Sequence, residues 1–260
     1  MTALDTVLAD LDVLGGRLDD LVAGLSEERW CTATPAAGWD VKHQVVHLAW
    51  TDEVALLAAT DKARWDEVVL AALEDPAGFV DRMADEGAAA PGVDVLARWR
   101  LARPALAEAL RAYPAGQRMP WFGPPMSPTS MATARFMETW AHGLDVHEAL
   151  GVEPQVDDRI RHVAHLGVRT RDFAFGLHGL EPPAGEFRVS LTAPTGEVWQ
   201  WGPDDAPQSV AGPAYDFCLL VTQRRDRAAL ALEATGPDAD RWLDVAQAFA
   251  GPPGAGRGAG

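Results

Sequence analysis

Three side chains in two segments have the types and spacing of a metal site. Glu138 and His142 are four residues apart, which places both on one face of a helix, one turn from each other. His47 stands in an apolar run. Leaving a buried polar group unsatisfied costs about 1–3 kcal/mol, and a buried charge without a partner costs more. One divalent ion would satisfy all three side chains, and one carboxylate with two imidazoles leaves a fourth position open for chemistry.

A simpler arrangement of the same residues has no metal. Glu138 and His142 could bond to each other, and His47 could be a core histidine with its hydrogen bonds satisfied. Spacing does not separate these two interpretations, because a Glu and a His four residues apart are common on helix surfaces.

Neighbouring residues add candidates for other roles. His43, four residues before His47, could be a further ligand or a proton relay. Arg135 lies three residues before Glu138 and could bind an anionic substrate, although the spacing favours a salt bridge. Asp52 and Glu53 follow His47 by one to two helical turns. They are the carboxylates that could serve as a base if the metal activated water.

The elements that carry these residues are predicted to be long helices. Apolar residues recur at spacings of three and four over residues 4–25, 41–57, 61–73 and 93–110, which is typical of amphipathic helices. Residues 113–129 are rich in proline and glycine and exclude a helix. Thr129 or Ser130 is expected to cap a last helix over 131–150, and Gly151 to end it. Several long helices joined by loops indicate an antiparallel bundle.

The remainder of the chain has a different pattern. After a helix over 156–177, the apolar period becomes two at 187–192, which predicts a strand. A turn at Thr195 and Gly196 leads to a return strand at 198–201. Further strands are expected at 208–211 and 230–234, and helices at 213–223 and 238–250. The predicted fold class is α plus α+β: a four-helix bundle over 1–178, a small α+β domain over 179–251 and a flexible tail over 252–260.

Composition limits the partners. The 260 residues include 22 Lys and Arg against 38 Asp and Glu, a net charge of −16. Because nucleic-acid binding needs a basic surface, nucleic acid is not expected as a partner. No run approaches the ~20 apolar residues of a membrane-spanning helix. The N-terminus lacks the basic region of a signal peptide. We therefore expect a cytoplasmic protein that acts on a small molecule.

Two segments resemble one enzyme family. Residues 38–48 fit its motif G-W-x-V-x5-H-L, and residues 138–146 fit E-x-W-x-H-x-x-D-V. Both are similar to segments of the mycothiol-dependent maleylpyruvate isomerases, which belong to the DinB-like four-helix metalloproteins. The resemblance implies that His47, Glu138 and His142 bind a divalent ion, most readily zinc.

The resemblance extends to the second domain and to the activity. It implies a sterol-carrier-like α+β fold and a functional arginine at Arg224, with Arg225 beside it. The same region also resembles the wyosine-formation segment of tRNA-modifying proteins. The implied activity uses mycothiol as a thiol cofactor, in an isomerase or an S-transferase. A hydrolase or lyase that uses metal-activated water, and a non-enzymatic protein that binds a small apolar ligand, are the alternatives.

Overall fold

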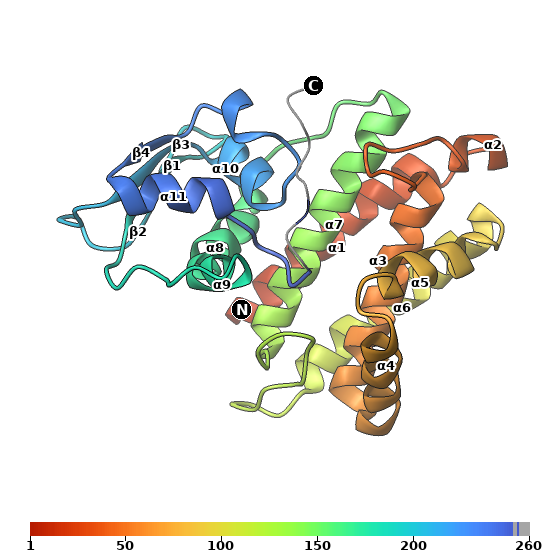
Figure 1. Cartoon of the computed structure of the whole chain (residues 1–260). Coiled ribbons are helices and arrows are strands. Elements are labelled where there is room, and N and C mark those ends of the chain that lie inside the picture. The colour runs from red at the N-terminus through yellow and green to blue at the C-terminus, as the bar shows by residue number, and fades with distance from the viewer. Residues whose placement is uncertain (252–253, 255–260) are drawn as a thin grey trace. The chain divides into compact units, whose positions relative to one another are not determined.

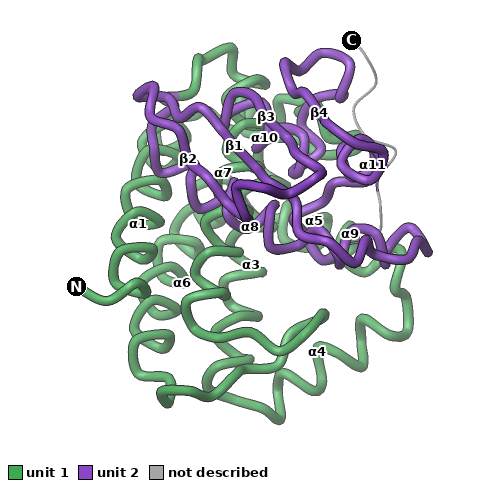
Figure 2. Tube along the Cα trace, turned by 90° about the vertical axis from the view of Figure 1, so that its left-hand side faces the viewer, with its two compact units in different colours: residues 1–154 green, residues 155–260 purple. Residues whose placement is uncertain are grey.

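The computed structural model describes residues 1–251 and 254, and the chain divides into two compact units. The first is Met1–Pro154 and the second begins at Gln155 (Figure 2). We expected the division at 178/179. It comes earlier because the two helices after residue 160 pack against helices of the second unit. The tail predicted over 252–260 lies outside the described residues, apart from residue 254.

The first unit is helical (Figure 1). Its four long helices form the bundle, in which α3 contacts both α6 and α7, and α1 contacts α7. This confirms the predicted fold class for the first part of the chain. The seven helices described in this unit are α1 (Ala3–Val22), α2 (Glu27–Trp30), α3 (Val41–Thr60), α4 (Lys62–Glu74), α5 (Phe79–Ala88), α6 (Gly92–Ala112) and α7 (Pro128–Leu150).

Helix α3 is the central element of the first unit. It contacts α4, α5, α6 and α7, and buried residues follow one another along it from Val45 to Ala49. A helix that buries residues on all sides belongs in a core. His47 is therefore held inside the bundle by the packing of its own helix. Trp99 of α6 is fully buried and belongs to the hydrophobic core cluster that includes Val45 and Leu48 of α3.

The residues that cap α7 determine where the helix carrying Glu138 and His142 begins and ends. Ser127 caps its N-terminus by accepting a hydrogen bond from the Ser130 amide. The predicted cap at Thr129 or Ser130 is wrong, because Pro128 starts the helix. Proline suits the first helical position, where an amide hydrogen has no partner in the helix. Gly151 ends α7 in the left-handed conformation, with φ of 67°, as predicted.

The second unit combines a mixed four-stranded sheet with helices, which confirms the α+β part of the fold class. Its strands lie in the order β2-β1-β3-β4: β1 pairs with β2 and β3 with β4 in antiparallel fashion, while β1 and β3 are parallel. The strands are β1 (Arg188–Thr192), β2 (Val198–Trp201), β3 (Ser209–Pro213) and β4 (Glu233–Thr235); the helices are α8 (Arg161–Arg169), α9 (Arg171–Leu177), α10 (Ala214–Val221) and α11 (Pro237–Val245).

Three predicted elements of this unit differ from the structure, and the first is the strand expected over 230–234, which starts only at Glu233. The helix expected over 156–177 is interrupted at Thr170, whose hydroxyl oxygen lies 3.0 Å from the carbonyl oxygen of Leu166 and 2.9 Å from that of Gln247. The helix expected to reach residue 250 ends at Val245, because the backbone becomes extended at Ala246.

None of the helices in the described part of the chain is long and apolar enough to cross a membrane.

Candidate metal centre

Helices α3 and α7 bring three ligand atoms together inside the bundle. The Nε2 atom of His47 lies 3.4 Å from Oε2 of Glu138, and Nε2 of His142 lies 3.2 Å from the same oxygen. One nitrogen or oxygen atom from each residue lies within 4.8 Å of the others. Zinc ligands at ~2.0–2.2 Å in a tetrahedron are roughly 3.4 Å apart. The spacing of the three atoms therefore suits a divalent ion at this site.

The charge state of Glu138 also suits a cation. Burial raises the pKa of this carboxyl. The hydrogen bonds and charges of His142 and His47 lower the pKa by more than burial raises it. The net result is a pKa well below the usual range of glutamate. The carboxylate is therefore ionised at neutral pH, as a metal ligand must be.

The two histidines differ in what their other ring nitrogen meets. Nδ1 of His142 lies 2.5 Å from Oε1 of Gln44, a side chain with no solvent exposure. Nδ1 of His47 is buried and has no hydrogen-bond partner among the described residues. Metal-binding histidines usually donate from the second nitrogen to an acceptor that fixes the ring. Among the residues that the structure describes, His142 has such an acceptor and His47 has none.

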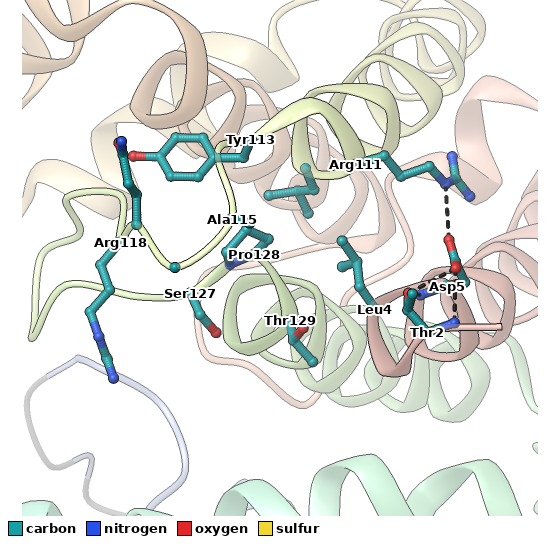
Figure 3. A pocket seen from close by; sticks show the side chains of 13 residues that line it. Thr2, Leu4, Asp5, Arg111, Tyr113, Ala115, Arg118, Ser127, Pro128 and Thr129 are labelled. Atoms are coloured by element: carbon teal, nitrogen blue, oxygen red, sulfur yellow. Dashed lines mark hydrogen bonds and ion pairs between the residues drawn. The ribbon is translucent and has the colours of Figure 1, made fainter.

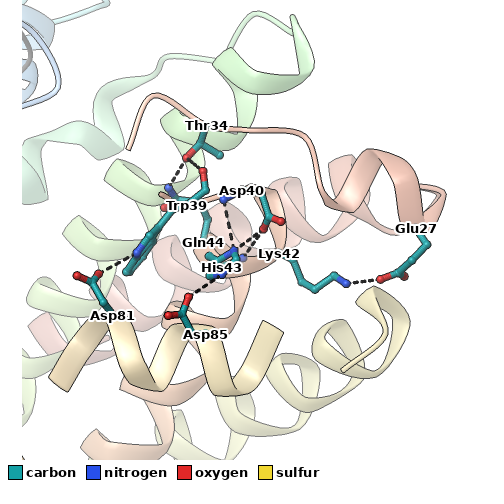
Figure 4. Close-up of polar contacts among 9 residues, drawn as sticks. All are labelled: Glu27, Thr34, Trp39, Asp40, Lys42, His43, Gln44, Asp81 and Asp85. Atoms are coloured by element: carbon teal, nitrogen blue, oxygen red, sulfur yellow. Dashed lines mark hydrogen bonds and ion pairs between the residues drawn. The ribbon is translucent and has the colours of Figure 1, made fainter. Parts of the chain in front are cut away.

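Trp39 forms a wall beside the two histidines. The centroid of its ring system lies 5.3 Å from the centroid of His47 and 5.9 Å from that of His142, where the rings are stacked. The indole N–H donates to Oδ1 of Asp81 in α5, at 2.9 Å (Figure 4). Helix α5 therefore holds the ring that covers one side of the three ligands.

His43 lies outside the group of three ligands. Its Nδ1 is 2.6 Å from Asp40 and its Nε2 is 3.2 Å from Asp85 of α5 (Figure 4). Both ring nitrogens thus face carboxylates. The structure gives His43 a role in attaching α5 to the start of α3, and not that of a fourth ligand.

Arg135 forms a buried salt bridge, which confirms the favoured interpretation of this residue. Its Nε donates to Oδ1 of Asp52 at 2.8 Å, and its Nη2 donates to the hydroxyl of Thr51 at 2.6 Å. The other carboxylate oxygen of Asp52 accepts from the indole N–H of Trp99 at 3.1 Å. Arg135 and Asp52 are 1% and 4% exposed, so neither side chain is available to a substrate.

Glu53 also forms an ion pair with an arginine, Arg98. Both of its oxygens accept hydrogen bonds from Arg98, at 2.7 and 2.6 Å. The two carboxylates that could have acted as a base with metal-activated water are thus both engaged in ion pairs.

Arg224, the predicted functional arginine, lies in the second unit just after α10. Its Nη1 donates to the carbonyl of Thr222 at 2.8 Å. The three metal-ligand candidates lie in the first unit, and the role of Arg224 stays a prediction.

A separate cavity of about 660 Å³ lies at the N-terminal ends of α1 and α7. It includes Leu4, Tyr113 and Thr129, and none of the three ligand candidates borders it. Figure 3 shows the Arg111 guanidinium directed towards Asp5, with which it forms an ion pair of 3.8 Å. The position of this cavity makes it distinct from the metal centre.

Gln44 and Asp81 have contacts at the site that the sequence patterns did not predict. Gln44 had a signal, because it is an uncharged polar residue among valines, three residues before His47. A buried amide in such a run must find partners. Asp81 had no comparable signal, since its contact with Trp39 joins residues 42 positions apart.

Family models match both parts of the chain. The family model "Mycothiol maleylpyruvate isomerase N-terminal domain" matches residues 11–147, and the model "Wyosine base formation" matches residues 183–233. Uncharacterized proteins from two Mycobacterium tuberculosis strains, CDC 1551 / Oshkosh and ATCC 25618 / H37Rv, are each 56% identical over 250 residues. These matches cover 96% of this chain and 97% of each relative.

Two solved structures share the fold. A crystal structure of the mycothiol-dependent maleylpyruvate isomerase matches with a TM-score of 0.57 at 11% identity, and its histidine-to-alanine mutant matches with 0.59 at 12%. Both matches cover 91% of this chain and 95% of the other. At this level of identity the likeness shows the fold alone.

Proposed function

Because the chain belongs to the mycothiol maleylpyruvate isomerase N-terminal domain family, we propose that it is a divalent-metal-dependent enzyme. In this proposal His47, Glu138 and His142 hold the ion, which is most readily zinc. A low-molecular-weight thiol of the mycothiol type reacts with an electrophilic small molecule, in an isomerase or an S-transferase reaction. The observation that carries the proposal is the convergence of the three ligand atoms from α3 and α7.

The chain's own residues have distinct tasks in this proposal. The ion would lower the pKa of a thiol that reaches it, so that thiolate is available near neutral pH. Glu138 supplies the negative charge of the ligand set, and the two imidazoles supply neutral donors. Trp39 shields one side of the ligands from water, because its ring lies against both histidines. The family resemblance also implies a functional role for Arg224, which lies in the second unit.

The ion pairs near the site favour thiol chemistry over activated water. A hydrolase or lyase of the alternative type needs a carboxylate base close to the ion. Asp52 is buried in its pair with Arg135, and Glu53 makes two hydrogen bonds to Arg98. A carboxylate held by a guanidinium is a weaker proton acceptor than a free one.

A specific observation supports the non-enzymatic alternative. In the second unit a cavity of about 470 Å³ is lined largely by apolar residues, among them Val156, Ala193 and Pro194. A small apolar ligand would suit such a lining. This candidate function predicts ligand binding that persists after the metal ligands are removed, and fluorescence titration with an apolar probe would measure it.

Elemental analysis of the purified protein tests the metal proposal. We expect about one zinc or other divalent ion per chain in the wild type and less than a tenth of that in His142→Ala. His147→Ala is a matched control, because His147 lies on the same helix but bonds to the carbonyl of Val152. It should retain the ion. Wild-type protein that stays metal-free after dialysis against zinc would refute the proposal.

A second measurement tests the thiol. The loaded protein is mixed with mycothiol and a panel of conjugated electrophiles, and consumption of the electrophile is followed by absorbance. We expect turnover that requires both the ion and the thiol. Equal rates with and without thiol would instead favour the water-activating alternative.

A further inference from the structure

We infer that Gln44 is a positioning residue which fixes the proton of His142 on Nδ1, so that Nε2 presents its lone pair to the ion. The inference rests on the proposed metal site and goes beyond it, since Gln44 is not a ligand. It follows from a chain of hydrogen bonds in which every donor and acceptor is determined. The chain starts at the backbone carbonyl of Trp39 and passes through Thr34 and Gln44, as Figure 4 shows, and it ends at His142.

The first link sets the direction of the whole chain. The carbonyl oxygen of Trp39 can only accept, and it does so from the hydroxyl of Thr34 at 2.8 Å and from the Thr34 amide at 2.9 Å. A threonine hydroxyl has one hydrogen. Because that hydrogen points to Trp39, the hydroxyl oxygen is left with lone pairs alone for its next neighbour.

The second link orients the amide of Gln44. Its Nε2 lies 2.9 Å from the Thr34 hydroxyl oxygen. The side-chain amide has one end that donates and one that accepts. Since the hydroxyl oxygen must accept at this contact, the donating NH₂ group faces Thr34. The carbonyl end, Oε1, then faces His142.

The third link determines the ring of His142. Oε1 of Gln44 accepts at 2.5 Å from Nδ1 of His142, so Nδ1 carries a hydrogen. In a neutral imidazole the other nitrogen then has the lone pair. That nitrogen is Nε2, which lies 3.2 Å from Glu138, on the side where the three ligand atoms converge.

Burial makes this arrangement hard to replace by water. Gln44 has no solvent exposure, and an apolar side chain there would leave Nδ1 of His142 without its acceptor. Losing such an outer partner typically weakens metal affinity about 10–100-fold. His47 offers a comparison inside the same site, because its Nδ1 has no partner among the described residues. Fixing the ring through an acceptor is thus a property of His142.

The test compares metal affinity in three variants, measured by competition with a chromophoric chelator at pH 7.5 with zinc as the probe. Gln44→Leu removes the acceptor at similar volume, and we expect the Kd to rise about 10–100-fold. Gln44→Glu keeps an acceptor for Nδ1, and its Kd should stay within about threefold of the wild type or become tighter. Thr34→Val removes the hydroxyl that orients the amide, and we expect a smaller rise.

A spectroscopic measurement makes the test independent of folding defects in the variants. In zinc-loaded wild-type protein with ¹⁵N-labelled histidine, long-range ¹H–¹⁵N correlation spectra report which ring nitrogen of His142 is protonated. His142→Ala identifies the signal by its loss. We expect the proton on Nδ1. A proton on Nε2 overturns the inference.

The outcomes for Gln44 and for the metal site can be told apart. If His142→Ala keeps the ion, the proposed function fails first. If His142→Ala loses the ion while Gln44→Leu binds zinc as tightly as the wild type, the metal site stands and the role of Gln44 is wrong.

Discussion

Replacing Arg135 by methionine leaves Asp52 as a buried carboxylate without its cation. Asp52 is 4% exposed and keeps one hydrogen bond, from the indole N–H of Trp99. Breaking a buried ion pair from one side costs about 3–5 kcal/mol, because the remaining charge is uncompensated. For a unit of this size, 1 kcal/mol lowers Tm by roughly 2–4 °C, so Arg135→Met should melt roughly 6–20 °C below the wild type.

A double variant separates the cost of leaving Asp52 charged without a partner from the cost of losing the packing of Arg135. Asn in place of Asp52 has no charge but retains an oxygen for the indole of Trp99. We expect Asp52→Asn/Arg135→Met to be at least ~2 kcal/mol more stable than Arg135→Met alone. Arg98→Met is a matched control. Its pair with Glu53 is more than a third exposed on both sides, so it should cost less than about 1 kcal/mol.

Urea unfolding of the metal-free proteins in a chelator, followed by circular dichroism at 222 nm, gives the free energies of unfolding. The helical signal reports mainly on the first unit, where the substitutions lie. If Arg135→Met costs no more than Arg98→Met, or if the two changes at 52 and 135 simply add, the buried pair does not hold α3 and α7 together in the way the distances indicate.

Three further measurements follow from the structure. Metal affinity should fall as pH is lowered from 8 to 5.5, because protons compete with the ion for the histidine ligands. The pKa of Glu138 lies well below its usual range, so this carboxyl has no proton to release. Calorimetry should therefore find at most two protons released on binding in that interval. Asp19→Asn should destabilise the protein by about 1–2 kcal/mol at pH 7. The hydrogen bond from Arg100 lowers the pKa of Asp19 despite burial, so the wild-type advantage is present above the unfolded pKa of ~3.9 and disappears as pH falls through the lower folded value. Gly92→Ala should lower the free energy of unfolding in urea by about 1–3 kcal/mol, because the added Cβ would lie 2.4 Å from the ring of Trp30. An unchanged urea midpoint would mean that this ring moves freely.

The long helices could be predicted because their apolar spacing is a local property. The sequence patterns located α1, α3, α4, α6 and α7 to within a few residues. Helix α5 was missed, since among its ten residues only Phe79 and Ala84 are buried. Its position depends on the contacts of Asp81 with Trp39 and of Asp85 with His43. Such contacts join distant parts of the chain and leave no periodic signal.

The identity of the candidate ligands was easier to predict from the sequence than the orientation of their side chains. The residue types, the i, i+4 spacing on α7 and the apolar run around His47 indicated three candidate ligands, and the family resemblance implied the same set. Which nitrogen of His47 faces Glu138 depends on the crossing of α3 and α7, and spacing does not encode that crossing. The parallel pairing of β1 with β3 in the second unit was missed for the same reason.

Two acidic side chains of the bundle, Asp52 and Glu138, have separate partners within the chain. Asp52 is neutralised by Arg135, and Glu138 faces the two imidazoles, which can carry protons when no ion is present. Small zinc domains that lack such internal compensation are unfolded without metal. If the proposed site holds an ion, we expect the bundle to assemble without it and to take it up afterwards. We therefore expect occupancy to follow the free metal concentration of the cell, with the ion exchanging between folded molecules rather than being acquired once during synthesis.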